Sequence, residues 1–562
     1  MKILILGGYG TFGGRLVELL ADLNGIEILV AGRSLTKAQA YCDGFRGAAT
    51  VTPLALDRAD IAEALDRLAP DALVDASGPF QAYGSDPYAV VRACIAAGVA
   101  YFDLADSAAF VAGIDQFDEA AKAANIPVLS GVSSFPVLTT AVVTEIAREM
   151  DVRAIFAGIA PSPHAGVGLN VLRAVLGYAG APVTHLEGGG LTTSVGLGTT
   201  RRAAICVPGH LPLPTSRFSI VDVPDHQVIP ALMPEVSDIW MGAAPTPGYL
   251  HRTLNLLALA RARFGLPSPA PLAPVCHWVL NTLAHGPHRG GMLVRVAGMR
   301  DGAPASANWA LQAEGDSGPL IPSMAVAALL RDMVSRKIRP AGARAATQDL
   351  SLADYDPLFK AHGIATGFRR DWPATKNLYR RVLGDAFDKM PPALQALHSV
   401  TRKHIWSGRA EVTRGRNPLA RFIADRIGFP KAGKDVPVTV TLIADGAGGE
   451  RWHRNFDGAE FRSHQSGGRT INSTLIVECF GPVRVRLATV IDGDRLRIIP
   501  QHWSLWAMPL PRYLLPGGDT FEDVDDQGRF RFNVTIAAPL IGLIVAYRGW
   551  LVEEDAGKAK AC

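Results

Sequence analysis

Three glycines near the start of the chain, Gly8, Gly10 and Gly13, have the spacing GxGxxG. They follow the apolar run at residues 3–6 and precede a stretch with helical periodicity. At such a junction Gly8 permits a tight turn, Gly10 lets the backbone approach a pyrophosphate, and Gly13 allows the helix to pack closely against the strand. The spacing in this position predicts a dinucleotide site, and a glycine turn without a ligand is the alternative.

The helix that begins after these glycines directs its first turn toward the bound phosphates. Thr11 and Phe12 occupy this turn together with Gly13. Backbone N–H groups at a helix amino end are free to bind an anion, and the helix dipole favours negative charge there. We therefore include Thr11 and Phe12 among the cofactor-binding residues.

The end of the second apolar run carries a basic residue where sites that prefer NAD carry an acidic one. Those sites place Asp or Glu about 20 residues after the glycines, to bind the ribose 2′-hydroxyl. Here Arg33 and Ser34 follow the run instead. Arginine binds a 2′-phosphate through charge-assisted hydrogen bonds, so we expect NADP, with NAD as the less favoured cofactor. The other interpretation of Arg33 is an ordinary surface arginine.

Two further positions follow the third and fourth apolar runs. Asp57 comes after the third run and is placed to reach the adenine edge, although a capping role for it is an open alternative. The turn Ser77-Gly78-Pro79-Phe80 comes after the fourth run, near the expected nicotinamide end of the cofactor. Ligands collect at the carboxyl ends of strands in open α/β sheets, so we predict that all of these residues line the cofactor site.

Candidate acid/base groups follow the fifth run. Asp103 and Asp106 lie where substrate is expected to meet cofactor, and either could exchange a proton or bind an ammonium group. Tyr83 and Tyr101 are candidate proton donors. The alternatives are loop capping for the two aspartates and simple packing for the two tyrosines. We predict a catalytic group drawn from these four residues and no metal site.

The elements that position these residues alternate between buried strands and amphipathic helices. Strands are expected at 51–56, 72–75, 99–104 and 126–129, and helices at 11–24, 60–69 and 87–97. Continuous apolar strands separated by helices predict an α/β fold with a doubly wound parallel sheet of the Rossmann type over residues 1–150.

Two further domains are expected after this sheet. Residues 151–360 predict an α+β domain, and residues 375–552, with many short alternating strands, predict a β-rich domain. In the middle domain we expect helices at 168–178, 249–264 and 321–335, a strand at 292–296, and a loop at 339–343.

Composition narrows the class of protein. The 562 residues are 48% hydrophobic and 19% charged with a net charge of +4, which excludes wholesale disorder and gives no basic run for binding nucleic acid. Six cysteines, the last at Cys562, lie far apart without metal-ligand spacing, which is typical of reduced thiols in the cytoplasm. We expect no signal peptide, and the apolar run at 537–547 is interpreted as a core segment because it is too short to span a bilayer.

The last domain combines aromatic and basic residues, including Trp503, Trp506, Tyr547 and Trp550. One interpretation is a groove for an apolar or anionic ligand, or a membrane surface. The interpretation that we favour is a β-sheet core with a solvated basic face.

Three motifs together carry a family resemblance. The segments 75–80 (DASGPF), 101–107 (YFDLADS) and 130–136 (SGVSSFP), with the glycine loop, resemble saccharopine dehydrogenase-like oxidoreductases. The resemblance extends from residue 1 to about 360, while residues 375–552 resemble an uncharacterised domain found fused to such modules.

The resemblance implies an NADP-dependent oxidoreductase that transfers a hydride at a C=N bond, or at a related carbonyl carbon, of a small substrate. Such an enzyme acts on CH–NH, C=O or C=C groups. Its middle domain binds the substrate and has homodimerisation as a second role. Two alternatives stay open: an NADPH-dependent carbonyl or enoyl reductase, and a redox-sensing protein that binds NADP(H) without turnover.

Overall fold

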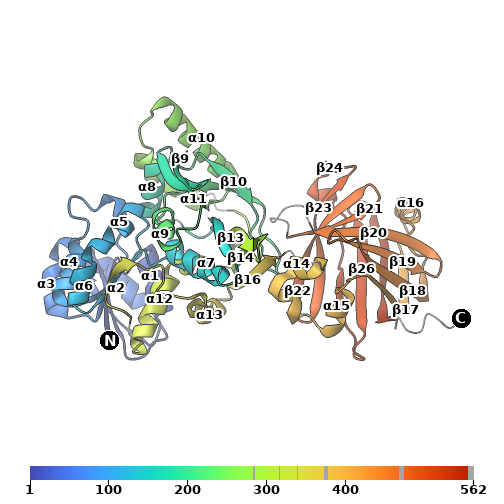
Figure 1. Ribbon diagram of the computed structural model, residues 1–562, viewed down its shortest axis with the longest axis horizontal. Helices are drawn as coiled ribbons and strands as arrows, with labels where there is room; N and C mark the ends of the chain where they lie inside the picture. The colour runs from blue at the N-terminus through green and yellow to red at the C-terminus, as the bar shows by residue number, and fades with distance from the viewer. Residues whose placement is uncertain are drawn as a thin grey trace. The chain divides into compact units, whose positions relative to one another are not determined.

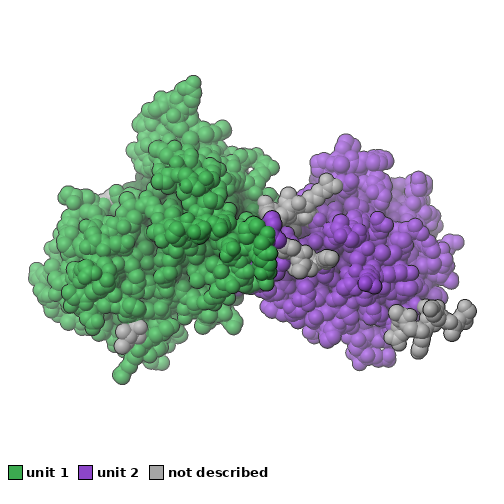
Figure 2. All heavy atoms as spheres, in the orientation of Figure 1, with its two compact units in different colours: residues 1–203, 215–302, 311–365 green, residues 204–214, 303–310, 366–562 purple. Residues whose placement is uncertain are grey.

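The computed structural model describes residues 1–166, 168–282, 285–315, 317–337, 339–372, 377–467 and 474–554 (Figure 1). It divides into two compact units, which Figure 2 colours green and purple. The first unit contains residues 1–203, 215–302 and 311–365, and the second contains residues 204–214, 303–310 and 366–562.

The first unit begins with a parallel sheet in the order β15-β6-β5-β4-β1-β2-β3. These strands are β1 (Lys2–Leu6), β2 (Glu27–Gly32), β3 (Thr50–Ala55), β4 (Ala72–Asp75), β5 (Ala100–Asp103), β6 (Pro127–Ser130) and β15 (Gly342–Ala345). They are short and almost wholly apolar because both faces of the sheet are covered. This arrangement confirms the predicted Rossmann-type fold.

Helices cover the sheet on both faces (Figure 1). On one face α3 (Ile61–Leu68) and α4 (Ala89–Ala97) pack against Leu4, Leu73 and Tyr101 in one hydrophobic core. On the other face α1 (Thr11–Leu19) packs against α12 (Ile321–Val334), where the Ser323 hydroxyl donates a hydrogen bond to the Phe12 carbonyl at 3.0 Å. The sheet is therefore doubly wound.

The strand order reverses at β1. Because β2 and β3 lie on one side of β1, and β4, β5 and β6 on the other, the loops after β1 and β4 diverge and leave a crevice at the carboxyl ends of the strands. Apart from Tyr101, which lies within β5 and packs in the core, the predicted cofactor and acid/base residues lie at or after the ends of β1 to β5, so the fold brings them to this one edge.

Strand β15 corrects one expectation. The segment 339–343 was expected to be a loop, but Gly342–Ala345 pairs in parallel with β6, with Gly342 opposite Pro127. Its small residues give no apolar run to indicate a strand. Pairing with a strand more than 200 positions earlier is a tertiary effect that a local pattern does not contain.

The middle of the chain forms a mixed sheet in which β10, β11, β12, β7 and β13 are consecutive. Only the pairing of β12 with β7 is parallel among these neighbours. The strands are β7 (Asp151–Ala160), β10 (Thr200–Ala203), β11 (Ser216–Ile220), β12 (Asp238–Ala243) and β13 (Arg289–Arg300). Helices α8 (Leu169–Tyr178), α9 (Asp225–Leu232), α10 (Gly248–Phe264) and α11 (Ala273–Thr282) accompany them. The α+β character expected here is confirmed.

The second unit is dominated by an antiparallel sheet that closes on itself. Its order is β22-β21-β20-β19-β18-β17-β27-β26-β25-β23-β24, and a further pairing of β22 with β23 joins the ends into a barrel. The strands are β17 (Lys403–Arg414), β18 (Gly433–Ala444), β19 (Glu450–Phe456), β20 (Ala459–Gly467), β21 (Ile476–Phe480), β22 (Val483–Asp492), β23 (Arg495–Leu505), β24 (Met508–Pro509), β25 (Phe521–Val524), β26 (Phe530–Ala538) and β27 (Gly542–Glu553). The β-rich prediction is confirmed.

Within the described ranges, no helix has the length and apolar character needed to cross a membrane. None of the five cysteines in those ranges forms a disulfide, and Cys562 lies outside them. The same ranges contain no group of three or more His, Cys, Asp or Glu side chains arranged to hold a metal ion.

Candidate functional site

The loop between β1 and α1 is built from glycines that leave no room for side chains. Gly7 has a φ of +76°, a backbone conformation that side chains rarely adopt. A Cβ on Gly13 would lie 2.2 Å from the Gly7 carbonyl oxygen, so only glycine lets α1 begin this close to β1. Gly10 is the N-cap residue of α1 and is exposed to solvent. The loop thus presents bare backbone and a helix amino end, which suits a pyrophosphate.

This geometry refines the roles expected of the glycines. The left-handed residue of the turn is Gly7, which the GxGxxG spacing does not include, while the Gly8 backbone donates its N–H to the Ala31 carbonyl at 3.0 Å. The signal for Gly7 was present in the sequence as a fourth glycine directly after the strand.

The loop after β2 holds Arg33 and Ser34 at the start of α2 (Leu35–Gly44). The Ser34 hydroxyl caps this helix by accepting the Lys37 backbone N–H at 3.4 Å, and the Ser34 N–H donates to the Tyr9 hydroxyl at 3.1 Å. Arg33 is exposed and forms no ion pair with any described residue. The carboxyl end of β2 therefore offers a free guanidinium, which is the charge that a 2′-phosphate requires.

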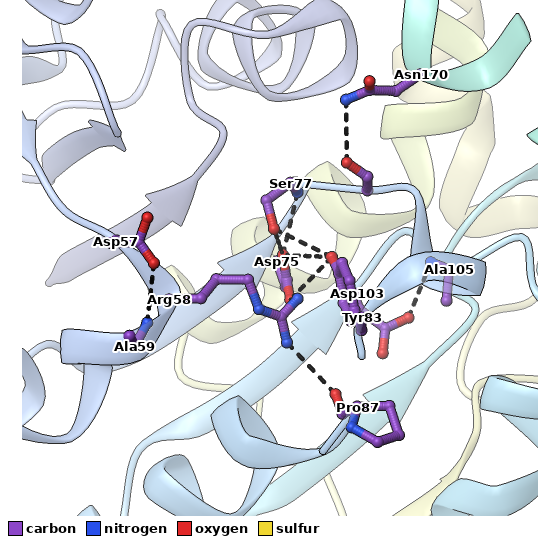
Figure 3. Close-up of polar contacts among 11 residues, drawn as sticks. Asp57, Arg58, Ala59, Asp75, Ser77, Tyr83, Pro87, Asp103, Ala105 and Asn170 are labelled. Atoms are coloured by element: carbon purple, nitrogen blue, oxygen red, sulfur yellow. Dashed lines mark hydrogen bonds and ion pairs between the residues drawn. The ribbon is translucent and has the colours of Figure 1, made fainter. Parts of the chain in front are cut away.

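Asp57 caps the short turn that follows β3. Its carboxylate accepts the Ala59 N–H at 3.1 Å, and the residue is exposed. This capping bond is the alternative left open by the sequence. The neighbouring Arg58 turns the other way, toward the interior of the sheet edge (Figure 3).

A buried ion pair lies at the carboxyl end of β4. Asp75 is fully buried, and its Oδ2 accepts from Arg58 Nη1 at 3.0 Å. Its Oδ1 accepts the Ser77 backbone N–H at 3.1 Å and the Ser77 hydroxyl at 2.6 Å. The Arg58 guanidinium also lies 3.4 Å from the centre of the Tyr83 ring (Figure 3). Asp75 and Arg58 fix the Ser77–Phe80 turn, and neither of them was predicted to belong to the site.

The two candidate tyrosines differ in their surroundings. The Tyr83 hydroxyl lies 3.1 Å from the Ser77 Oγ and 3.3 Å from the Asp75 Oδ1, and burial, followed by the Asp75 charge, raises its pKa. Tyr101 is completely buried in the core under α3 and α4, its hydroxyl has no hydrogen-bond partner among the described residues, and burial raises its pKa as well. Both phenols therefore keep their protons at neutral pH.

Asp103 is a buried carboxyl group with one free oxygen. Its Oδ1 accepts the N–H of Gly131 at 2.7 Å and of Ala105 at 3.0 Å, while Oδ2 has no partner within the described ranges. Burial raises the pKa of Asp103 to about 7, against the opposing effect of the two N–H groups. A group that titrates near neutrality at the carboxyl edge of the sheet is suited to general acid/base work.

Asp106 lies farther along the same loop and reaches solvent. Its Oδ1 accepts a hydrogen bond from Gln81 Nε2 at 3.1 Å. Desolvation by the surrounding protein raises its pKa, and the charge of Asp222 adds to this effect. Unlike Asp103, Asp106 is directly accessible to a substrate.

Segments from the middle of the chain reach the glycine loop. Asn170 Nδ2 donates to the Gly78 carbonyl at 3.0 Å, and Arg15 Nη2 donates to the Ala165 carbonyl at 2.9 Å. A cavity of about 440 Å³ is lined by Gly10 and Thr11 on one side and by His277 of α11 on the other. The cofactor and substrate regions predicted from the sequence are therefore contiguous within the first unit.

The described residues fit a dinucleotide that carries a 2′-phosphate. Side chains at Gly8, Gly10 and Gly13 would each meet backbone within 3.0 Å, so the loop is kept bare by necessity. Phe80 is 6% exposed and packs against Phe110, while Ser77, Gly78 and Pro79 are partly exposed.

Two family models match the chain. Residues 3–129 match the Saccharopine dehydrogenase NADP binding domain, and residues 390–551 match a domain of unknown function, DUF4166. Both parts of the family resemblance are confirmed, and the first match supports an oxidoreductase with an NADP-binding domain. No curated protein gives a significant match to the chain.

Several solved structures are similar to part of the chain. Apo saccharopine dehydrogenase (L-Glu forming) from Saccharomyces cerevisiae is 15% identical, with a TM-score of 0.47, over 66% of this chain and 100% of the other. Amine dehydrogenase from Mycobacterium smegmatis is 13% identical, with a TM-score of 0.31, over 62% and 95% of the two chains. A dehydrogenase (MviM) from Clostridium difficile is 10% identical, with a TM-score of 0.30, over 64% and 98%.

Proposed function

We propose that this protein is an NADP-dependent oxidoreductase that reduces a C=N bond, or a related carbonyl carbon, of a small substrate. The observation that carries the proposal is the meeting of three features at one sheet edge. These are a bare glycine loop at a helix amino end, the free Arg33 guanidinium, and the half-satisfied carboxyl group of Asp103. The first two suit the cofactor, and the third suits the proton that such a reduction consumes.

Each end of the cofactor has its own residues. The backbone at Gly10, Thr11, Phe12 and Gly13 holds the pyrophosphate, while Arg33 and Ser34 bind the 2′-phosphate. The Ser77–Phe80 turn supports the nicotinamide end, and Asp57 lies beside the adenine end. When bound, the cofactor supplies a hydride from C4 of its nicotinamide ring.

Asp103 is the proposed source of the proton, which reaches the substrate through a water molecule at the surface of the site because the Asp103 side chain is fully buried. Reduction of a C=N bond adds a hydride to carbon and a proton to nitrogen, so the residue must be protonated when the substrate binds. Burial keeps a large share of Asp103 protonated at pH 7 because its pKa is raised to about 7. Asp106, which is exposed, orients a cationic substrate, and Tyr83 and Tyr101 hold the wall around Asp75 and Asp103.

We propose residues 1–150, 151–360 and 375–552 as three functional domains. The first binds cofactor, the second binds substrate, and the third binds a separate ligand. The hydrogen bond from Asn170 to Gly78 supports the second assignment, since it joins the middle segment to the turn at the nicotinamide end.

The first experiment is a fluorescence titration of the purified chain with NADPH and NADH. We expect NADPH to bind more tightly and Arg33→Ala to weaken NADPH binding while leaving NADH binding unchanged. Arg67→Ala is the matched control, because Arg67 is also exposed and forms no ion pair with a described residue. Failure of both nucleotides to bind would refute the oxidoreductase assignment.

A second step separates an enzyme from a redox sensor. With NADPH bound, oxidation of the cofactor is followed at 340 nm in the presence of mixtures of 2-oxo acids or aldehydes with amines, and with carbonyl or enoyl compounds alone. Turnover with carbonyl–amine mixtures only supports reduction of a C=N bond. Tight binding without turnover on any class would favour the sensor.

We propose a homodimer formed through the middle of the chain. Helices α10 and α11 expose Leu256, Phe264, Val275 and Trp278 at 68%, 72%, 61% and 67% of their surfaces. Exposed apolar residues gathered on neighbouring helices are typical of an interaction surface. Light scattering should give twice the chain mass for the wild type. The double variant Leu256→Glu/Phe264→Glu should have the mass of one chain. Phe422→Glu, at an exposed residue of the second unit, is the control.

A further inference from the structure

The barrel of the second unit surrounds a cavity of about 680 Å³. A barrel of eight strands has an interior that side chains just fill or that holds one small ligand, and wider barrels leave more room. The closed ring here has ten strands, since β24 only extends β23. The volume falls within the range of roughly 300–1,000 Å³ that is usual for small-molecule sites. The cavity therefore has the size of a binding site.

One end of the cavity is closed by α14 (Leu378–Leu383) and α15 (Pro392–Leu397), which belong to the barrel's hydrophobic core. The segment that contains these helices also binds polar groups of the wall. The Tyr379 hydroxyl donates to Gln465 Oε1 at 2.9 Å, and His398 Nε2 lies 2.6 Å from Glu522 Oε2. Gln465 and Glu522 both line the cavity. This end is blind, and the Tyr379 hydroxyl and His398 Nε2 are already paired with the wall.

The other end is open and apolar. Helix α16 (Pro418–Ile427) contributes Leu419 and Ile423 to the lining, and the turn between β26 and β27 contributes Leu540. Leu419 is 51% exposed and Leu540 is 96% exposed, so the cavity reaches the surface here. In Figure 1, α16 lies on the side of the barrel away from α14 and α15.

Residues 537–547, interpreted from the sequence as a core segment, include both core and surface. Ile544, Val545 and Tyr547 of β27 are buried in the barrel core, as expected. The turn between Ala538, where β26 ends, and Gly542, where β27 begins, lies at the surface and carries the exposed Leu540. A solvent-exposed leucine costs hydrophobic free energy unless something apolar covers it.

The charged groups in the described wall are balanced. Arg454 Nη2 lies 3.4 Å from Glu478 Oε1, and Ser463 bridges the two by accepting from Arg454 at 2.9 Å and donating to Glu478 at 2.7 Å. The remaining charged residue of the described lining, Glu522, binds His398. An ionic group on a ligand would thus be buried without a counter-ion, which is costly.

The wall also contains a hydroxyl group that is free to bind a ligand. The Tyr547 hydroxyl forms no hydrogen bond with any described residue, although its ring packs against Phe456 and Phe532. Burial raises the pKa of Tyr547 to about 12, so the phenol stays protonated and is able to donate one hydrogen bond. This donor matches a single uncharged oxygen.

We propose that the barrel binds a long-chain, uncharged amphiphile, such as a fatty alcohol, ester or ketone, with its oxygen on Tyr547 and its chain along the apolar wall. The ligand enters between Leu419 and Leu540. Of the interpretations considered for this domain, an apolar ligand groove is the one that this cavity favours. Two arginines on the outside of the barrel, Arg531 and Arg548, are paired with Asp523 and Glu411.

The test uses the full chain and the neutral fluorophore N-phenyl-1-naphthylamine. Its emission should rise and saturate on binding, and 1-dodecanol should displace it. Dodecanoate at pH 8 has the same chain length with a charged end, and it should compete at least about tenfold more weakly than the alcohol. No saturable emission, or competition by dodecanoate equal to that of dodecanol, would overturn the proposal.

Two variants locate the site. Val534→Trp fills the cavity from β26 and should abolish binding of the fluorophore. Val552→Trp is the matched control, because Val552 is 42% exposed and is not part of the lining, and it should bind as the wild type does. Equal loss of binding in both variants would place the fluorophore elsewhere and overturn the assignment.

Tyr547→Phe keeps the ring and removes only the hydroxyl. It therefore tests ligand binding in the cavity even if Val534→Trp fails to fold. We expect dodecanol to bind about three- to tenfold more weakly and dodecane to compete unchanged, as expected for one lost hydrogen bond. Unchanged dodecanol affinity would refute the role of Tyr547. NADPH binding by the same variants serves as the control for folding of the first unit.

Discussion

Replacement of Asp103 by asparagine tests whether this carboxyl group is protonated in the folded protein at neutral pH. Asparagine has the same shape, and its Oδ1 accepts the same N–H groups of Gly131 and Ala105. Its amide nitrogen takes the place of Oδ2, which has no partner among the described residues. The substitution therefore removes the charge and little else.

The expected difference in stability between Asp103→Asn and the wild type follows from the pKa values. The folded pKa is about 7 and the ordinary value is 3.8. Because the folded pKa is raised, the unfolded chain binds fewer protons between these values, and the wild type loses stability as the pH rises from about 4 to about 7. Each pH unit in this window changes the free energy of unfolding by about 1.4 kcal/mol. The free energy of unfolding of Asp103→Asn, relative to that of the wild type, should thus grow by about 3 kcal/mol between pH 5 and pH 8, and most of this change should be complete near pH 7.

Native-state hydrogen exchange with mass spectrometry of peptides from β4, β5 and β6 measures this locally. Asp66→Asn is the control, because Asp66 is exposed on α3 and should give no pH-dependent difference. A difference between Asp103→Asn and wild type that does not change with pH would show that Asp103 stays ionised, and would remove it as the proton donor.

Other substitutions test the remaining parts of the structure. Gly13→Ala should abolish NADPH binding and lower the melting temperature, because the new Cβ would lie 2.2 Å from the Gly7 carbonyl oxygen. Gly44→Ala is the control: a Cβ there has no neighbour within 4 Å, so NADPH binding and the melting temperature should not change. Arg58→Met leaves the buried Asp75 carboxylate without its cation and should cost about 3–5 kcal/mol in urea unfolding at pH 7. A loss below about 1 kcal/mol would contradict the buried pair. Burial raises the pKa of Glu450 to about 7, so Glu450→Gln should raise the melting temperature of the barrel at pH 8 but not at pH 4. A variant that melts at the same temperature as the wild type at both pH values would refute that shift.

The regular elements of the first sheet were predictable because they are continuous apolar runs with clear stops. The predicted helix at 249–264 corresponds to Gly248–Phe264, and the one at 321–335 to Ile321–Val334. The helix predicted at 11–24 ends earlier, at Leu19, where Leu20 already leaves helical geometry. Periodicity located these elements but did not fix their ends.

The site was less predictable, because it depends on partners from distant strands. The burial of Asp103 follows from the strands on both sides of β5 and from the Gly131 N–H, which comes from the loop after β6. In the sequence, Asp75 is only a polar residue at the end of a predicted strand. Its ion pair with Arg58 forms only when β3 and β4 lie in one sheet. Nothing in the alternating pattern of the last domain distinguished a hollow barrel from a packed core, since both turn apolar residues inward.

The position of β15 has a consequence for synthesis on the ribosome. Strand β6 ends at Ser130, but its outer neighbour begins only at Gly342. At about 5–20 residues per second, roughly 10–40 s separate the emergence of these two strands. Throughout that interval the nascent chain displays an unpaired sheet edge, which is a template for wrong strand pairing. A fragment that stops before Gly342 keeps this edge permanently, so truncated versions of the cofactor domain should aggregate unless the segment through Ala345 is supplied with them.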